Sequence, residues 1–302
     1  MTKFEKCLAD AEQGDADSQC TLGEYYYQHQ NFTEAKYWWE LAAAQNCPQS
    51  TYNLSLLYYQ GLGVAQDFER TLAYLESAKN LGDVSAIFML GVHYLKGGMV
   101  PKDIEKSYQY LNETVAIVPD HIGAHYNLAV MKINEIKSEE NLKEAIEHLL
   151  YVSMMESEFK QSAQLLLGEI YLGRQKYDHA LMTLEALSRL VSEDNQLHET
   201  QLGILYSYLG CIYKHGLGIK MDLNKAKLYF TQSAKCNNVQ SQCEIAYLLI
   251  QGKNDNDLPE IRHWLTLACD NGDDKACAVL KQVDALQKKL LEEYSFDGVL
   301  PS

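Results

Sequence analysis

Apolar and polar positions between residues 50 and 82 follow the helical period of 3.6 residues in two successive segments. Gly61 follows the first segment, where a helix end requires a residue that tolerates positive φ. Asp67 precedes the second segment and can accept hydrogen bonds from its first free N–H groups. The chain therefore predicts a helical hairpin here. Its inward-facing positions are Leu54, Leu57 and Tyr58, then Leu72, Leu75 and Ala78.

Similar hairpins recur along the chain. Their first helices share the pattern small-x-x-x-Leu-Gly-x-x-Tyr, as at residues 18–26, 86–94 and 163–171, and their second helices follow a capping residue. The first caps lie 36, 36 and 38 residues apart, a period typical of a helical solenoid. The predicted caps are Asn31, Asp67, Asp103, Asn141, Asp222 and Asp257.

The connecting loops carry a family resemblance. Gly61-Leu-Gly-Val-x-x-Asp67 and its counterparts at 97–103 and 216–222 are similar to the loop of Sel1-like repeats, relatives of tetratricopeptide repeats. The resemblance covers about residues 10–280. It implies an all-α fold, a right-handed α-α superhelix of about seven hairpins with capping helices, and a role in binding proteins rather than a shared active site.

We expect one solenoid domain over residues 1–294. Between Arg189 and Gln201 the distance between successive caps stretches to 46 residues, which predicts an extended helix or a bend. The predicted hairpins span about 14–46, 47–82, 83–118, 119–157, 158–191, 201–237 and 238–272; the capping helices are 1–13 and 274–293, and 295–302 is a disordered tail.

The formal charge of −15 is concentrated in the first two thirds of the chain. Residues 1–100 hold 6 Lys and Arg against 12 Asp and Glu (−6), residues 101–200 hold 9 against 17 (−8), and the rest hold 11 against 12 (−1). Such a field disfavours nucleic acid and anionic membranes and favours a partner protein with a basic face. The alternative is that the acidity only maintains solubility.

The N-terminal sequence lacks the apolar run of a signal peptide, and no stretch is long and apolar enough to span a membrane. We therefore expect a cytoplasmic protein. Two cysteine pairs, Cys236/Cys243 and Cys269/Cys277, are placed as in cysteine-rich, secreted members of the family, and that resemblance implies staples between repeats. The missing signal peptide and the other four cysteines favour reduced thiols instead.

Candidate chemistry is sparse. His121 and His125 share a helix face but have no third ligand nearby, so we expect no metal site. Residues 255–257 begin like a calcium loop but lack its glycine and distant glutamate, so a capped turn is the better interpretation. No phosphate loop or nucleophile motif is present in the sequence. We expect neither a cofactor nor catalysis.

The resemblance implies that the first helices line a concave surface. Helical geometry then places exposed positions two before the Leu, one after the Gly and one after the Tyr of each pattern. In the first four hairpins these positions form an aromatic and aliphatic stripe beside carboxylates, which suits a protein interface. The alternative is that many of the rings pack against the neighbouring hairpin. The predicted partner-binding residues are Glu24, Tyr27, Tyr52, Leu56, Tyr59, Phe88, Val92 and Tyr126, with Cys20 at the same kind of position.

Three functions follow from these patterns. The first is a non-catalytic adaptor or regulator that binds a partner protein in its concave groove. The second is an immunity-type inhibitor or secretion-linked factor that neutralises one partner. The third is an enzyme or small-ligand binder of the cysteine-rich kind, for which no motif in this sequence provides support.

Overall fold

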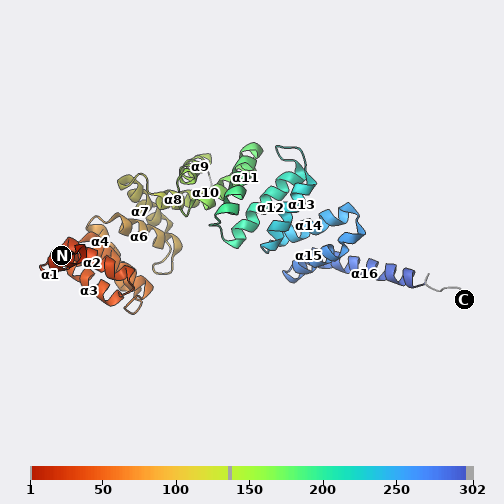
Figure 1. Cartoon of the computed structure of the whole chain (residues 1–302). Helices are drawn as coiled ribbons and strands as arrows, with labels where there is room; N and C mark the ends of the chain where they lie inside the picture. Colours follow the sequence, from red (N-terminus) through yellow and green to blue (C-terminus); the bar gives the residue numbers. More distant parts are fainter. Residues whose placement is uncertain (1, 135–137, 297–302) are drawn as a thin grey trace. The chain divides into compact units, whose positions relative to one another are not determined.

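The structure is a computed structural model that describes residues 2–134 and 138–296, and these residues form sixteen α-helices, one short 3₁₀ turn and no strand (Figure 1). The all-α fold class predicted from the sequence is confirmed. The helices are α1 (Lys3–Glu12), α2 (Ala16–Gln28), α3 (Phe32–Ala43), α4 (Pro48–Gln60), α5 (Phe68–Asn80), α6 (Val84–Lys96), α7 (Ile104–Ile117), α8 (Ile122–Asn134), α9 (Glu139–Met154), α10 (Lys160–Gly173), α11 (Tyr177–Glu193), α12 (Glu199–His215), α13 (Leu223–Lys235), α14 (Val239–Gly252), α15 (Leu258–Asp270) and α16 (Asp274–Phe296), with the turn η1 (Asp255–Asp257) before α15.

The chain divides into two compact units, residues 1–148 and 149–302. In unit 1, helices α2/α3, α4/α5 and α6/α7 pair as successive hairpins, and α1 packs on α2. In unit 2, the pairs are α10/α11, α12/α13 and α14/α15, and α16 packs on α15. Of the tail predicted at 295–302, residues 295 and 296 still belong to α16, and 297–302 lie outside the described residues.

Most predicted caps form. The side chains of Asp67, Asp103 and Asp222 accept hydrogen bonds from N–H groups in the first turns of α5, α7 and α13. The predicted cap at Asn141 is wrong, because α9 begins at Glu139 and the Ser138 hydroxyl accepts the Asn141 N–H at 3.1 Å. The sequence rule required a small residue four positions after the cap and therefore selected Asn141 before Ala145, although Ser138, 35 residues after Asp103, is nearer the period of 36.

A second exception lies at the start of α15. Asp257 precedes α15, but its carboxylate accepts from the Asn254 side chain at 3.1 Å instead of from the first turn of the helix. Pro259 lies in that first turn and lacks an N–H, so fewer donors need a partner there. The predicted capped turn at 255–257 is therefore a short 3₁₀ turn with its own side-chain bond.

Replacing Asp103 or Asp222 with Ala should cost about 1 kcal/mol of unfolding free energy, because the helix N–H groups lose their acceptor. The Asn variants keep an acceptor oxygen and should lose only a few tenths of that amount. Urea denaturation of the wild type and all four variants checks this expectation. Equal losses for Ala and Asn would show that the charge of these aspartates matters more than their capping bonds.

Three hairpins share a further device that we call the Tyr–cation–Tyr stack. A tyrosine of the first helix is followed after twelve residues by Arg or Lys and after sixteen by a second tyrosine. The two rings stack at 5.6–5.8 Å with 15–16° between their planes, and the cation lies 4.6–5.2 Å from the centre of the first ring. Stacking and the cation–π contact both stabilise the pairing of the helices. The stacks are Tyr58/Arg70/Tyr74, Tyr94/Lys106/Tyr110 and Tyr213/Lys225/Tyr229.

Candidate partner-binding surface

The eight predicted partner-binding residues all lie on the first helices of the hairpins in unit 1. We call them the first-helix surface. Every one of them is partly exposed, so each retains some area that a partner could contact. They come from α2 (Glu24 and Tyr27), α4 (Tyr52, Leu56 and Tyr59), α6 (Phe88 and Val92) and α8 (Tyr126).

The aromatic members of this surface also connect neighbouring helices. The Tyr59 ring on α4 lies 4.9 Å from the imidazole of His93 on α6, and the Phe88 ring lies 4.5 Å from that of His121. Tyr52 packs against the core between α5 and α6, which includes Leu75. These contacts support the alternative interpretation, in which the rings pack between hairpins. Truncating the rings should therefore lower stability as well as any affinity for a partner.

Within α2 and its own hairpin, Tyr27 contacts the rings of Phe32 and Trp39 at 5.5 and 5.6 Å. Glu24 accepts a hydrogen bond from the Gln49 amide at 2.6 Å, which fixes its carboxylate between α2 and α4. Cys20, expected at an exposed position of the same helix, is buried instead, and its carbonyl accepts from the Trp39 indole at 3.2 Å. The Cys20 thiol faces Cys47 and Ser50 at the start of α4, so the neighbouring hairpin covers it.

The histidines behind this surface favour the neutral form. Burial lowers the pKa of His93, and the nearby Lys96 ammonium lowers it further. Burial also lowers the pKa of His121, and His125 adds to the effect. Near pH 7 these imidazoles therefore contribute no positive charge, and carboxylates such as Glu24 set the sign of the local field.

The corresponding positions in unit 2 differ in exposure, and Glu169 and Ile250 are exposed. Leu165, Ser207 and Cys243 are buried, although the pattern places them like the exposed residues of unit 1. The sequence pattern locates the helix face but not the depth to which the neighbouring hairpin covers it.

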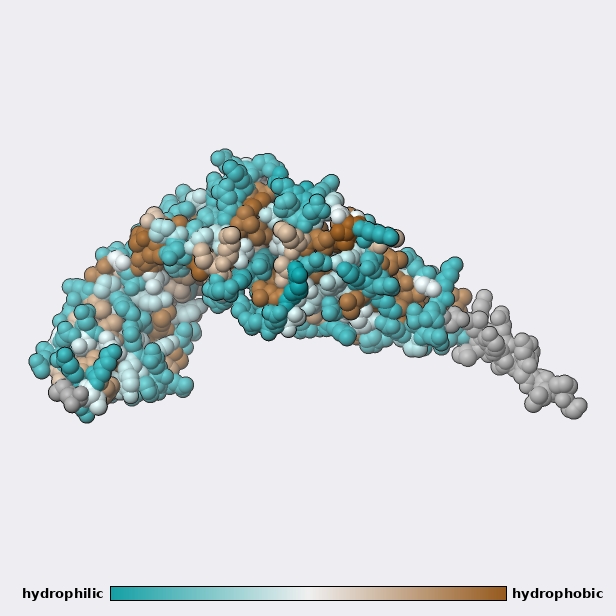
Figure 2. Space-filling model, turned by 45° about the horizontal axis from the view of Figure 1, so that its top comes forward, coloured by the Kyte–Doolittle hydropathy of each residue, from teal (hydrophilic) through white to brown (hydrophobic). Residues whose placement is uncertain are grey.

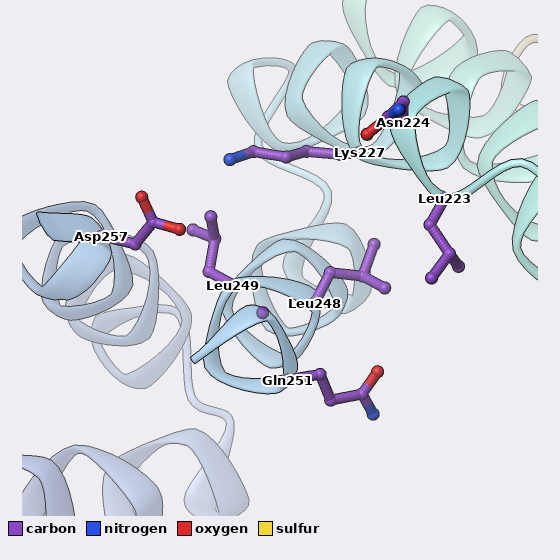
Figure 3. A pocket seen from close by; sticks show the side chains of 8 residues that line it. Leu223, Asn224, Lys227, Leu248, Leu249, Gln251 and Asp257 are labelled. Carbon is purple, nitrogen blue, oxygen red and sulfur yellow. The ribbon is translucent and has the colours of Figure 1, made fainter. Parts of the chain in front are cut away.

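Sequence reasoning missed a hollow in unit 2, formed where the start of α13 meets the end of α14 (Figure 3). It has a volume of about 270 Å³ and an apolar lining from Leu223, Leu248 and Leu249. Lys227 lies at its rim and pairs with Glu260 at 3.9 Å. No motif signals this hollow, because its lining comes from two hairpins and from single apolar positions in each.

The two cysteine pairs behave differently. Cys269 and Cys277 form a disulfide, with their Cα atoms 4.8 Å apart, while Cys236 and Cys243 are free. The expectation of reduced thiols is therefore wrong for Cys269 and Cys277. Cys269 lies within α15 and Cys277 in the first turn of α16, whereas Cys236 lies beyond the end of α13, so the two pairs do not occupy equivalent positions. Cys243 faces Asp273 instead, and burial raises the pKa of its thiol to about 11.

We expect six of the eight cysteines to react with iodoacetamide in protein denatured without a reductant, and all eight after reduction. Reducing the protein should also loosen the junction between α15 and α16, because the bond constrains the unfolded chain. Intact-mass spectrometry counts the alkylated thiols. Eight reactive thiols before reduction would contradict the Cys269–Cys277 bond.

The fold defines a class: an all-helical repeat protein built from successive hairpins. The chain belongs to the Sel1 repeat family, whose profile matches residues 16–47, 48–83, 84–113, 205–238 and 239–273. Members of this family are generally modules for protein–protein interaction and helical scaffolds without enzymatic activity. The stretch 114–204 lies between the matched repeats.

Two bacterial relatives illustrate the similarity. The Sel1-repeat-containing protein YjcO of Escherichia coli K12 is 29% identical over 109 residues, which are 35% of this chain and 45% of that protein. The protein NMB1327 of Neisseria meningitidis serogroup B is 41% identical over 236 residues, 76% of this chain and 46% of that protein. The chain thus spans about half the length of the curated relatives that it matches.

Two solved structures have the same fold. A protective antigen of uropathogenic Escherichia coli with a Sel1-like fold aligns with a TM-score of 0.68, covering 94% of this chain and 67% of that chain. A Sel1 repeat protein of Oxalobacter formigenes aligns with a TM-score of 0.63, covering 83% and 96%. Both are 20% identical in sequence, so the likeness concerns the fold.

Two further observations limit the chemistry. In the part of the chain that the structure describes, no cluster of three or more His, Cys, Asp and Glu side chains is placed to hold a metal ion. None of the helices in the same residues combines the length and apolar character needed to cross a membrane.

Proposed function

We propose that this protein is a non-catalytic adaptor or regulator that binds a partner protein through the first-helix surface of unit 1. The observation behind the proposal is that all eight residues of this surface keep exposed area although they lie on tightly paired helices. Partly exposed aromatic and aliphatic side chains beside carboxylates are the composition that protein interfaces favour. Membership of the family supports a general role in protein binding, and the exposed area of these residues supports the first-helix surface as the binding site.

The charge of the chain supports a partner with a basic face. Residues 1–200 carry a net charge of −14, and burial keeps the nearby histidines neutral near pH 7. An acidic surface accelerates the approach of a basic partner, and salt screens this attraction. Raising the salt concentration should therefore slow association more than it changes dissociation.

The cytoplasmic location expected from the sequence stays a prediction. The Cys269–Cys277 bond is typical of proteins in oxidising compartments, whereas the six free cysteines are common in reducing ones. The redox state of this pair in protein isolated from its native cell, trapped by rapid acid quenching and alkylation, would distinguish the two environments.

The test uses Leu56 and Val92, the two aliphatic members of the first-helix surface, both of which are partly exposed. The double variant Leu56→Ser/Val92→Ser makes the surface polar. The matched control is Leu228→Ser, an exposed leucine on α13 in unit 2. A partner captured from native lysate and identified by mass spectrometry is then titrated against each purified protein by calorimetry.

We expect the double variant to bind about tenfold more weakly at a temperature where it is fully folded, as loss of interface contacts of about 1.4 kcal/mol predicts. It should also melt earlier, because both side chains are mostly covered. The control should bind like the wild type. If the control loses affinity and the double variant keeps it, the partner binds elsewhere and the first-helix surface is the wrong assignment.

A further inference from the structure

The fourth hairpin, α8 with α9, differs from the others at the positions of the Tyr–cation–Tyr stack. Lys132 stands where the first tyrosine is expected, Glu144 follows after twelve residues, and His148 follows after sixteen. The spacing of the stack is kept, but two rings and a cation are replaced by three titratable groups. This hairpin also falls within residues 114–204, which the family profile does not match.

Lys132 and Glu144 form the first polar link between α8 and α9. The Lys132 ammonium is buried, contacts the Glu144 carboxylate, and donates to the Tyr108 hydroxyl of α7 at 3.2 Å. Burial pushes the pKa of Lys132 down, but its hydrogen bonds to Glu144 and Tyr108 outweigh burial and the pKa is raised. The hydrogen bond from Lys132 lowers the pKa of Glu144, so this link persists in mild acid.

The second polar link joins two imidazoles. His125 Nδ1 on α8 lies 2.7 Å from His148 Nδ1 on α9, with the ring centres 4.9 Å apart. His125 Nε2 lies 2.9 Å from the Pro119 carbonyl oxygen, which can only accept, so this nitrogen carries a proton. In neutral His125 the proton of Nε2 leaves Nδ1 as an acceptor, and His148 Nδ1–H must be the donor.

This arrangement of protons limits how many further protons the His125–His148 contact can accept. A first added proton can bind His148 Nε2 and leaves the Nδ1–H···Nδ1 bond in place. A second can bind only His125 Nδ1, and then two N–H groups and two positive charges face each other across 2.7 Å. We propose that the His125–His148 contact is an acid-sensitive latch between α8 and α9, closed with no or one added proton and opened by two.

The charged groups around the latch set its pH range. His148 faces His125 and Lys132, which disfavour its protonation, and Glu144 and Glu147, which favour it. Burial is the largest influence, and it lowers the pKa of His148 below the ordinary value of 6.5. A base with a lowered folded-state pKa contributes its stability fully above the unfolded pKa. That contribution is lost as the pH falls from about 6.5 toward the lowered value.

Opening is therefore local. The imidazole link opens only when the second proton binds, below the lowered pKa of His148, while the Lys132–Glu144 link holds because the hydrogen bond from Lys132 lowers the pKa of Glu144. Helix α8 also carries Tyr126 of the first-helix surface, but the latch depends only on contacts between α8 and α9. It stands or falls independently of partner binding.

Hydrogen exchange on the full chain tests the latch. We expect peptides from α8 and α9 to lose roughly tenfold more protection between pH 7.5 and 5.0, after correction for the intrinsic exchange rate, than peptides from α6 and α7. His148→Gln keeps an N–H donor toward His125 at every pH and should abolish this excess loss. His29→Gln alters an exposed histidine of α2 and should leave it unchanged.

A pH titration of the wild type, followed by ¹⁵N NMR of the imidazoles, is a second test that does not depend on the folding of any variant. The pair should titrate in two separated steps, with the lower one well below the ordinary histidine value. The proposal is overturned if both imidazoles titrate together near 6.5, if the wild type shows no excess loss of protection, or if His148→Gln keeps that excess.

Discussion

Replacing Gly23 with Ala is expected to destabilise unit 1 by about 2 kcal/mol, although alanine is the better helix former. An added Cβ at this position would overlap the indole ring of Trp39, which is 2% exposed. The ring cannot move without losing the bond from its Nε1 to the Cys20 carbonyl at 3.2 Å. Overpacking costs about 3 kcal/mol, and the gain in helix propensity returns about 1 kcal/mol.

The matched control is Gly173→Ala at the end of α10, where nothing lies within 4 Å of the added Cβ. That variant should be neutral or more stable by about 0.5 kcal/mol. Chemical denaturation followed by tryptophan fluorescence measures both. In a Trp39→Phe background the Gly23→Ala cost should shrink, because the smaller ring leaves room. A stable Gly23→Ala variant would show that α2 and α3 can separate without loss.

Gly23 also shows why so much of the fold could be predicted from the sequence. The glycine of the Leu-Gly-x-x-Tyr pattern indicates where two helices approach closely, and the spacing of the caps indicates the length of a hairpin. Both are local constraints that each repeat carries by itself. The prediction failed at Asn141, where the loop before α9 is shorter and Ser138 supplies the cap. Ser138 keeps the period, at 35 residues after Asp103, but it lacks the small residue four positions later that the rule required.

The surface was predicted less completely than the fold. Helical geometry correctly placed Tyr59 and Phe88 at partly exposed positions, because residue spacing fixes the face of a helix. It could not show that their rings reach His93 and His121, since such contacts depend on how one hairpin packs on the next. The pairing of His125 with His148 is of the same kind: 23 residues separate the partners, and no spacing rule connects them.

The second large effect concerns Tyr59, whose ring lies 6.0 Å from that of Phe68 and 4.9 Å from that of His93. Tyr59→Ala should lower the unfolding free energy by about 2 kcal/mol, less than for a fully buried aromatic, because the ring is partly exposed. It should also weaken partner binding by about 2 kcal/mol, roughly thirtyfold, at a temperature where the variant is fully folded.

Tyr59→Phe separates these two effects, because it keeps the ring between the hairpins and removes only the hydroxyl. We expect its stability to lie within about 0.5 kcal/mol of the wild type. If the hydroxyl contacts the partner, affinity falls in both variants; if only the ring face does, affinity falls in Tyr59→Ala and is kept in Tyr59→Phe. Should Tyr59→Ala melt earlier yet bind like the wild type once folded, the ring serves only the packing between α4 and α6. The partner would then have to contact other residues, such as Leu56 and Val92, which the double variant tests separately.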